Sequence, residues 1–479
     1  MRFISFEGRT LRRSAGLGAV ALSIIACNTK DVLSVYDPSV ATPGSLQTAT
    51  AVPTVYAGAI GDFAAAWNGN GLTDAFVPTS GLLADEFRSS DTFTTRNDAD
   101  RRTQATPAAG NLSDNSYVAL QRARRSLEVG ATLVTKFNPT TDARAAELTA
   151  LAGYTYLLFG EGFCGNVPIP PTAQAEQILP AAGVGTTALF DTSIVRFSAA
   201  VAGLGTATTS AAAQAAINLA SVGRGRALLN EGKYALAAAA VAAVPDTFVY
   251  KIYYSSNAGR EQNSLWNLNG SNNRYTMADT EGTNGLNYRG ANDPRIPWKR
   301  INLANGNPQL GFDNTTLMYQ QLLQPTADAD VPLADGVEAR LIQAEALLNV
   351  NDPTWINVLN TLRANVGTLQ ARRYSDFGTV SASDSVTVST LAPLVDPGTA
   401  AARVDMLFRE RAFWLYATGH RLGDLRRLIR QYTRTANTVF PVGTSTKLGI
   451  YGNDVNLAIS FAEQNNTAYN AGACVTTQP

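Results

Sequence analysis

The residues that could carry out hydrolysis begin with an adjacent acidic pair, Asp85 and Glu86. Two carboxylates on either side of one glycosidic bond are the catalytic groups of a glycosidase. Adjacent residues of an extended segment point to opposite sides, so this pair is poorly placed to act on one substrate. The chain has one histidine, His420, whereas zinc sites and general bases rely heavily on imidazole. We therefore predict no enzyme activity, no metal and no cofactor, with a glycosidase as the enzyme alternative.

A second group of ionisable residues surrounds His420 between residues 403 and 430. It comprises Arg409, Glu410, His420, Arg421, Asp424 and Arg426. Buried arginines need partners, and carboxylates spaced along a helix–turn–helix provide them, so we predict a structural role for this group. We expect Gly419 to end the first helix, Asp424 to cap the second, and His420 to cap or brace the turn between them.

The N-terminus has the pattern of an export signal. Arginines up to Arg13 precede an apolar run from Leu17 to Ala26, which is too short to span a bilayer. The run ends at Cys27, after Ile-Ile-Ala, and this boundary is similar to a bacterial lipobox, in which the thiol is acylated. We predict a signal peptide over residues 1–26 and a lipid anchor at Cys27 as the membrane attachment. The alternative is an ordinary signal peptide that is cut near Ala26.

The remaining cysteines, Cys164 and Cys474, form an even pair if Cys27 is acylated. An exported chain reaches a compartment that permits disulfides. Our hypothesis is a bridge that ties the C-terminal tail to the body of the protein. The alternative is two buried thiols.

The bulk composition is typical of a folded chain with no preference for nucleic acid. Of the 479 residues, 45% are apolar and 16% are charged, which favours a packed core. The formal net charge is zero, and residues 1–26 carry four arginines against one glutamate. The mature chain would therefore be near minus three, without the basic surplus that nucleic-acid binding requires.

Helical hairpins must position these residues. Apolar side chains recur at helical spacing from Tyr117 to Val134 and again from Leu148 to Phe159. The alanine-rich residues 211–243 predict a tight hairpin of the tetratricopeptide type, and residues 334–366 predict another, with Asp352 as a helix N-cap. Long polar segments at 254–333 and 371–399 separate these units. We predict a mainly α fold of tetratricopeptide-like hairpins with long irregular loop insertions, and loops of this length are usually functional.

Residues 403–431 closely resemble the C-terminal signature of the SusD/RagB family. The matching motifs are Arg-Glu-Arg at 409–411, Gly-His-Arg at 419–421 and Asp-Leu-Arg-Arg at 424–427. Thr418 stands where the family usually has a glutamate, which puts one ion pair in doubt. Shorter resemblances lie at 33–43, 145–170, 344–348 and 359–367. We accordingly divide the chain into a signal peptide at 1–26, a tether at 27–52 and a single SusD-like domain at 53–479, with halves of about 53–250 and 251–479.

This resemblance implies a lipoprotein of the outer membrane, exposed at the cell surface. Such proteins sit as a lid over a SusC-like TonB-dependent transporter and deliver oligosaccharides to it, or peptides in some members. Peptide is therefore the alternative ligand class here. A helical-repeat scaffold of the envelope that binds no small ligand is a second alternative.

The resemblance also implies that loops hold the ligand, with aromatic rings stacked on sugars and polar groups bound to the hydroxyls. One candidate group lies near residue 67, and the other lies within 265–298, where Asn287, Arg289 and Trp298 are also found. The predicted ligand residues are Trp67, Asn68, Phe87, Arg88, Trp266, Asn267 and Tyr288.

Overall fold

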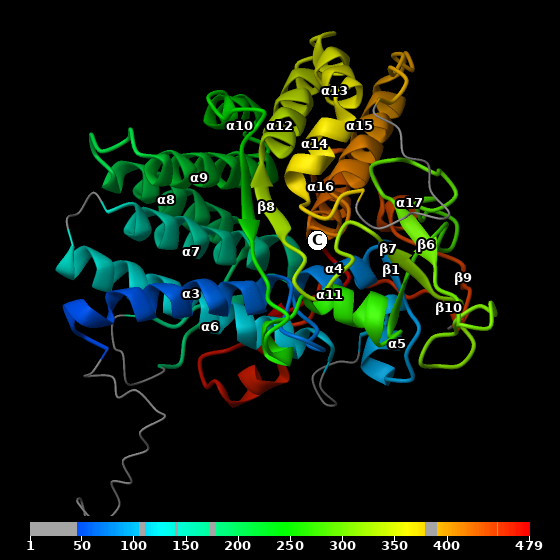
Figure 1. Cartoon of the computed structure of the whole chain (residues 1–479), viewed down its shortest axis with the longest axis horizontal. Coiled ribbons are helices and arrows are strands. Elements are labelled where there is room, and N and C mark those ends of the chain that lie inside the picture. Colours follow the sequence, from blue (N-terminus) through cyan, green and yellow to red (C-terminus); the bar gives the residue numbers. More distant parts are fainter. Residues whose placement is uncertain (1–45, 105–110, 139–141, 173–178, 379–389, 448) are drawn as a thin grey trace, which may run out of the picture. The chain divides into compact units, whose positions relative to one another are not determined.

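Helices dominate the computed structural model, and strands occur as short antiparallel pairs (Figure 1). The predicted mainly α fold is confirmed. The structure describes residues 46–104, 111–138, 142–172, 179–378, 390–447 and 449–479. The predicted signal peptide and Cys27 lie outside the described residues. Residues 48–479 form one compact unit.

The first long helices follow one another in space as they do in the sequence, each packed on the next (Figure 1). They are α3 (Val52–Trp67), α6 (Ser113–Phe137), α7 (Ala143–Gly162), α8 (Thr186–Gly203), α9 (Ala211–Asn230) and α10 (Tyr234–Val241). Side chains cap two of their N-termini: Asp142 accepts from the Arg144 backbone N–H and Ser210 from that of Ala213.

Small residues allow these helices to approach closely. A Cβ at Gly153 of α7 would lie 2.9 Å from the Phe197 ring of α8, and one at Gly223 of α9 would meet the same ring. The predicted hairpin between α9 and α10 is confirmed, with a turn at residues 231–233. Gly232 adopts φ +71° there, a left-handed conformation that glycine accepts without strain.

The second group of helices contains the other predicted hairpin. It comprises α12 (Gly336–Asn349), α13 (Trp355–Ala364), α14 (Val366–Arg373), α15 (Ala400–Trp414), α16 (Arg421–Gln431) and α17 (Ala436–Val439). The expected cap at Asp352 is wrong, because α13 begins at Trp355 and Thr354 occupies the N-cap position. The Asp352 carboxylate instead accepts hydrogen bonds from the Thr354 N–H and hydroxyl, at 2.9 and 2.6 Å, and holds the turn before the helix.

Short elements make up the rest of the described chain. The helices are η1 (Ala49–Ala51), α4 (Phe76–Leu83), α5 (Thr94–Asp100), η3 (Gly259–Glu261), α11 (Ser264–Trp266), η4 (Asn267–Ser271), η5 (Phe461–Asn465) and η6 (Ala471–Ala473). The strand pairs are β1 (Phe87–Ser89) with β5 (Tyr275–Met277), β2 (Val167–Pro168) with β3 (Gly183–Val184), β4 (Val249–Ile252) with β8 (Val331–Asp335), β6 (Trp298–Arg300) with β7 (Tyr319–Gln321), and β9 (Thr444–Ser445) with β10 (Gly449–Ile450).

Buried ion pairs join α15 and α16. The Arg411 guanidinium donates two hydrogen bonds to Asp424, at 2.8 and 2.9 Å, and Arg427 donates to Asp424 and Glu345. Both expected helix boundaries in this segment are wrong. Helix α15 ends at Trp414, five residues before Gly419, and α16 begins at Arg421, so that Asp424 lies in its first turn. The carboxylate of Asp424 binds guanidinium groups there, where ion pairing in the core takes precedence over capping.

The other members of the group around His420 are also paired. Glu410 accepts hydrogen bonds from Arg295 and Arg363, and Arg426 donates to the carbonyl oxygens of Gly160 and Phe163. Arg409 differs from these, because it is partly exposed and donates to Asn287 at 3.1 Å. The ring of His420 lies 2.8 Å from the Thr418 hydroxyl and 2.6 Å from the Arg226 guanidinium. His420 occupies the N-cap position of α16, but its side chain makes no capping hydrogen bond.

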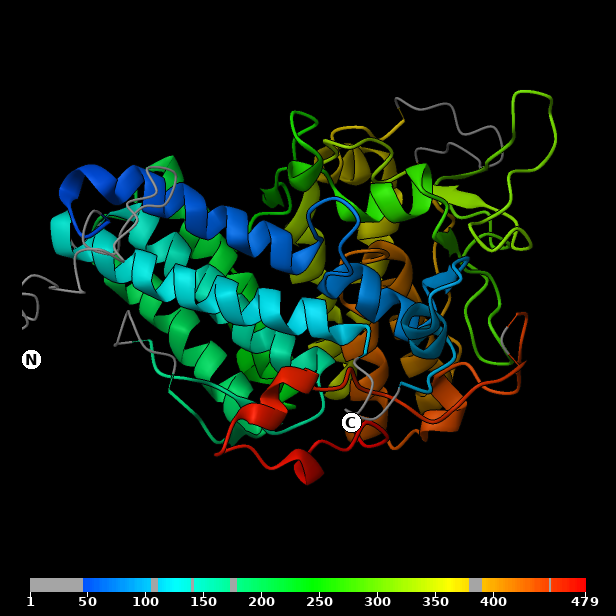
Figure 2. The ribbon, with the colours of Figure 1, turned by 90° about the horizontal axis from the view of Figure 1, so that it is seen from below.

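The C-terminal segment is joined to the helical body by a disulfide between Cys164 and Cys474, whose Cα atoms lie 5.2 Å apart. Figure 2 shows this segment, in red, beside α6. Tyr117 of α6 donates a hydrogen bond to Glu463 of the segment at 2.9 Å. Among the described residues, no helix combines the length and apolar content needed to cross a bilayer.

Candidate functional site

A cavity of about 500 Å³ opens among the loops and short strands, at the side of the molecule that carries β1, β6 and β7 (Figure 1). We call it the loop cavity. Its volume is within the range of small-molecule sites. Most of its lining comes from the insertion predicted at 254–333. The lining residues are Arg88, Thr276, Met277, Arg289, Thr315, Thr316, Leu317, Tyr319, Thr446 and Lys447.

The strands set the position of the first wall. Arg88 of β1 pairs with Thr276 of β5, and the Thr276 hydroxyl donates to the Leu317 carbonyl while it accepts from the Tyr319 N–H, each at 2.9 Å. The Arg88 Nε donates to Glu281 at 2.8 Å. Burial alone would lower the pKa of Arg88, but Glu281 raises it above the ordinary value, so Arg88 stays charged.

Lys447, another residue of the lining, forms a second ion pair, with Asp313. The Lys447 Nζ lies 2.7 Å from the Asp313 carboxylate and donates to the Asp91 carbonyl at 2.6 Å. Burial would raise the pKa of Asp313, but Lys447 and the N–H groups of Thr315 and Thr316 lower it to about 2. Asp313 is thus ionised at neutral pH.

Arg289 has no comparable partner. Its guanidinium lies 3.7 Å from the centre of the Tyr319 ring and 5.9 Å from that of Trp298. The two rings meet edge to face, with centres 5.8 Å apart. The nearest carboxylate, that of Asp279, is 3.9 Å away. The Nε of Arg289 is buried and makes no hydrogen bond within the described chain.

Two exposed phenyl rings lie close to the cavity. The Arg274 guanidinium is 3.6 Å from the centre of the Phe312 ring and 5.0 Å from that of Phe93. Phe312 is 47% exposed and Phe93 is 52% exposed, and Phe312 directly precedes Asp313, the partner of Lys447. We call these three residues the phenyl ledge. Local sequence does not set exposure, so no sequence signal separates these two phenylalanines from the buried ones.

Of the predicted ligand residues, only Arg88 lines the loop cavity. Trp67, Phe87 and Tyr288 are completely buried in the core. A ligand bound at the surface could contact these rings only if the core opened. Phe87 packs against Tyr416, with ring centres 5.6 Å apart, and Tyr288 packs against the same ring at 4.9 Å. Tyr288 is buried, whereas the next residue, Arg289, reaches the cavity.

The other predicted polar residues hold loops together. Asn68 donates to the Gln324 side chain at 3.1 Å, and Asn267 donates to Gln262 at 3.2 Å. Both asparagines are buried. Trp266 is partly exposed on α11 but does not line the loop cavity.

The acidic pair is buried beneath the loops. Asp85 accepts two hydrogen bonds from Arg421, at 2.6 and 2.8 Å, and Glu86 accepts one from the Ala417 N–H at 2.9 Å. Neither carboxylate lines the loop cavity. Among the described residues, histidines, cysteines and acids form no group of three or more that could hold a metal ion.

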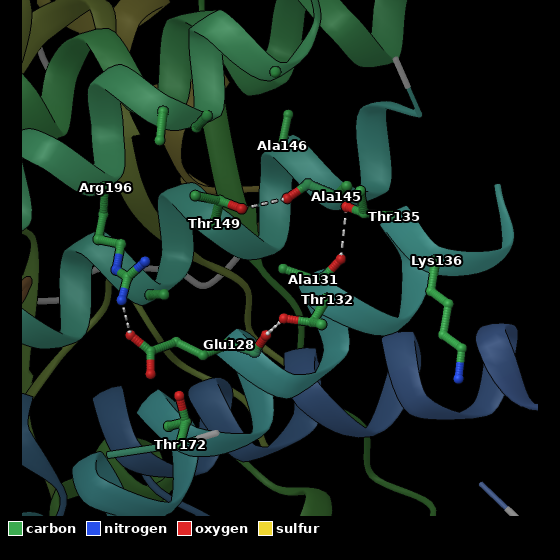
Figure 3. Close-up of a pocket in the computed structure, with 14 residues that line it drawn as sticks. Glu128, Ala131, Thr132, Thr135, Lys136, Ala145, Ala146, Thr149, Thr172 and Arg196 are labelled. Carbon is green, nitrogen blue, oxygen red and sulfur yellow. Dashed lines mark hydrogen bonds and ion pairs between the residues drawn. The ribbon is translucent and has the colours of Figure 1, made fainter. Parts of the chain in front are cut away.

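A hollow of about 600 Å³ lies between α6, α7 and α8 (Figure 3). Its threonine hydroxyls already bond to helix carbonyls, as Thr132 does to Glu128 and Thr149 to Ala145, at 2.9 and 2.7 Å. The Glu128 side chain is held by Arg196 at 2.7 Å. We take the loop cavity as the candidate site, because it is built by the long loops and contains Arg289, whose buried Nε makes no hydrogen bond within the described chain.

Comparison with known proteins finds relatives by structure alone. No family model matches the chain, and no curated protein matches it. A SusD/RagB family protein from Bacteroides thetaiotaomicron is 14% identical, with a TM-score of 0.56 over 78% of this chain and 87% of that one. A SusD-like carbohydrate-binding protein from Bacteroides fragilis is 12% identical, with a TM-score of 0.56 over 80% and 86%.

A third structure, a laminarin-binding SusD-like protein, is 13% identical, with a TM-score of 0.51 over 88% of this chain and 98% of that one. Each of the three matches covers 78% or more of this chain. At this level of identity the likeness concerns the fold. The chain therefore has the fold of the SusD/RagB proteins.

Proposed function

We propose that this chain is a SusD/RagB family lipoprotein of the cell surface, which captures oligosaccharides and delivers them to a SusC-like TonB-dependent transporter in the outer membrane. The observation that carries the ligand assignment is the phenyl ledge beside a cavity lined with threonine hydroxyls and cations. Sugars bind by stacking their C–H faces on aromatic rings and by hydrogen bonds to their hydroxyls. The names of the carbohydrate-binding and laminarin-binding relatives support the same assignment.

The proposed role requires no bond cleavage. The two carboxylates of the glycosidase alternative hold Arg421 and the Ala417 N–H in the core, at distances of 2.6 to 2.9 Å. Purified protein should leave a polysaccharide panel intact, and measurable hydrolysis would contradict this part of the proposal.

Ligand binding is tested by calorimetry and affinity electrophoresis of the detergent-purified full chain against neutral and acidic glycans. Phe312→Ala should weaken the binding of at least one glycan by roughly fivefold, because stacking on an aromatic ring contributes about 1 kcal/mol. Phe461→Ala is the matched control, since Phe461 is also exposed, at 40%, but lies outside the ledge and the cavity. Binding of peptides with no binding of glycans would transfer the role to the peptide alternative.

The anchor and the transporter are tested separately. Metabolic labelling with a fatty-acid probe should mark the wild-type chain and leave Cys27→Ser unmarked. Affinity purification from detergent-solubilised membranes, followed by mass spectrometry, should recover a TonB-dependent barrel protein. Recovery of other envelope proteins, without a barrel and without any glycan binding, would favour the scaffold alternative.

A further inference from the structure

The loop cavity carries an excess of positive charge in its lining. Arg88, Arg289 and Lys447 contribute guanidinium or ammonium groups, and the described lining contains no acidic side chain. The other polar side chains of the lining are those of the threonines and Tyr319, which carry hydroxyl groups. An anionic group would therefore meet cations in this cavity.

Two of these cations are already paired with acidic side chains of the protein itself. Arg88 is bonded to Glu281, whose side chain is 2% exposed, and Lys447 is bonded to Asp313, whose side chain is 6% exposed. Neither acid is among the residues that line the cavity. The Lys447 ammonium is fully engaged, because it also donates to the Asp91 and Ser89 carbonyls. The Arg88 guanidinium is bonded through its Nε and one Nη, both to Glu281.

Arg289 is the cation that remains available. Asp279 is the nearest acid, at 3.9 Å, and its other carboxylate oxygen accepts from the N–H groups of Arg289 and Gly290 at 3.0 Å. Within the described chain, the Arg289 guanidinium makes no hydrogen bond. A buried donor without a partner is unfavourable, and a ligand acceptor would remove this penalty.

The stacking of Arg289 on Tyr319 prepares the guanidinium for one kind of ligand. A guanidinium that lies 3.7 Å from a ring centre has one face covered, while its N–H groups point outward in its own plane. Those donors fit two oxygens of a single oxyanion in a bidentate arrangement. A neutral sugar hydroxyl would accept only one such bond and would not neutralise the charge.

We infer that the loop cavity binds an acidic glycan, with a sugar carboxylate or sulfate ester held by Arg289 on its Tyr319 platform. This inference rests on the proposed function, since it names the class of glycan that the same site takes. The hydroxyls of Thr315 and Thr446, both on exposed residues of the lining, are available to the sugar hydroxyls around the anion.

The test compares polymers that differ only in charge, using calorimetry with the detergent-purified full chain. Polygalacturonate is paired with its methyl-esterified form, and dextran sulfate is paired with dextran. The wild type should bind at least one charged polymer about tenfold or more tightly than its neutral counterpart, as expected for hydrogen bonds to a charged group. Preference for polygalacturonate alone identifies the carboxylate as the source, and preference for dextran sulfate alone identifies the sulfate.

Substitutions distinguish recognition of the anion by Arg289 from a general electrostatic attraction to positive charge. Arg289→Gln should abolish the preference for the charged polymer, and Arg289→Lys should restore it only in part, because the charge returns without the planar fork. Arg300→Gln removes one positive charge from β6, outside the cavity lining, and should leave the preference unchanged. Equal losses in Arg289→Gln and Arg300→Gln would overturn the inference. Thermal melts should confirm that all three variants are folded.

The inference and the proposed function fail in different ways. Binding of neutral polymers without any preference for charged ones overturns the inference and leaves glycan capture intact. Absence of binding to every polymer in the panel contradicts both. Poly-glutamate that binds as tightly as the charged glycan overturns the glycan assignment and shows that the cavity accepts any carboxylate polymer.

Discussion

The guanidinium of Arg421 holds the carboxylate of Asp85 through two hydrogen bonds, at 2.6 and 2.8 Å, between residues that are 336 positions apart in the sequence. Both side chains are buried. These hydrogen bonds attach the start of α16 to the segment just before β1. Arg88 of β1 lines the loop cavity. The signature segment around His420 therefore supports the loops that form the candidate site.

Removal of one member of this pair should be costly. Asp85→Asn is expected to lower the free energy of unfolding by about 3–5 kcal/mol, because it leaves Arg421 charged and unpaired in the core. Chemical denaturation measures this change. Asp405→Asn provides the control, since Asp405 pairs with Arg434 at the surface and should contribute about 1 kcal/mol or less. Similar effects from both substitutions would contradict the assignment of Asp85 to the core.

Glu86 should make stability depend on pH. Burial raises the pKa of Glu86 from 4.5 to about 8, so the folded protein keeps this carboxyl protonated where the unfolded chain ionises it. Its contribution is greatest below the unfolded pKa, near 4.5, and is lost as pH rises through about 8. Glu86→Gln, which keeps an acceptor for the Ala417 N–H, should be more stable than the wild type at pH 9 by several kcal/mol, on the order of 5 for a shift of this size.

That comparison requires measurements at two pH values. Thermal melts at pH 5 and pH 9 should show a smaller difference between the two conditions in Glu86→Gln than in the wild type. A pH dependence that the substitution leaves unchanged would mean that Glu86 titrates normally.

The disulfide between Cys164 and Cys474 should leave neither cysteine with a reactive thiol until it is reduced. After denaturation without reductant, Cys164 and Cys474 should not react with a thiol reagent, and they should react once reductant is added. Replacement of both by serine should lower the free energy of unfolding by about 2–4 kcal/mol, because the bridge restrains the unfolded chain. Detection of two free thiols in the unreduced, denatured protein would disprove the bridge.

Trp67 is expected to stabilise the core by its packing. Trp266 is expected to contribute less to the stability of the fold. Trp67→Ala should lower the free energy of unfolding by about 3–5 kcal/mol, because it leaves a cavity where a fully buried indole was packed. Trp266→Ala, at a partly exposed position, should have a smaller effect. If Trp67→Ala instead removed glycan binding while stability was preserved, the ring would belong to the ligand site.

Tyr319 is expected to position Arg289 through its ring and not through its hydroxyl. Tyr319→Phe should keep the preference for a charged glycan, while Tyr319→Ala should reduce it by about three- to tenfold, the loss expected for a cation–π contact of about 1 kcal/mol. Calorimetry with the charge-matched polymers measures both variants. Equal losses in the two would indicate that the hydroxyl binds the ligand directly.

Local sequence was sufficient for the helical hairpins. The spacing of apolar residues predicted helices near α6 and α7, and the alanine-rich run with Gly232 predicted the α9–α10 hairpin, because period and turn chemistry are properties of neighbouring residues. Helix ends were less certain. Asp424 has the residue type of a cap but lies within the first turn of α16, where Arg411 and Arg427 bind its carboxylate.

The location of the candidate site could not be obtained in the same way. Phe87 and Arg88 are adjacent in β1, yet the phenyl ring is buried and the guanidinium reaches the cavity. Trp67 has the residue type of a sugar platform but is enclosed by the core, whereas Phe312 is exposed. The sequence by itself determined which residues could stack or carry charge. Only the tertiary structure decided which of them face solvent, because burial depends on segments that are distant in the chain and adjacent in space.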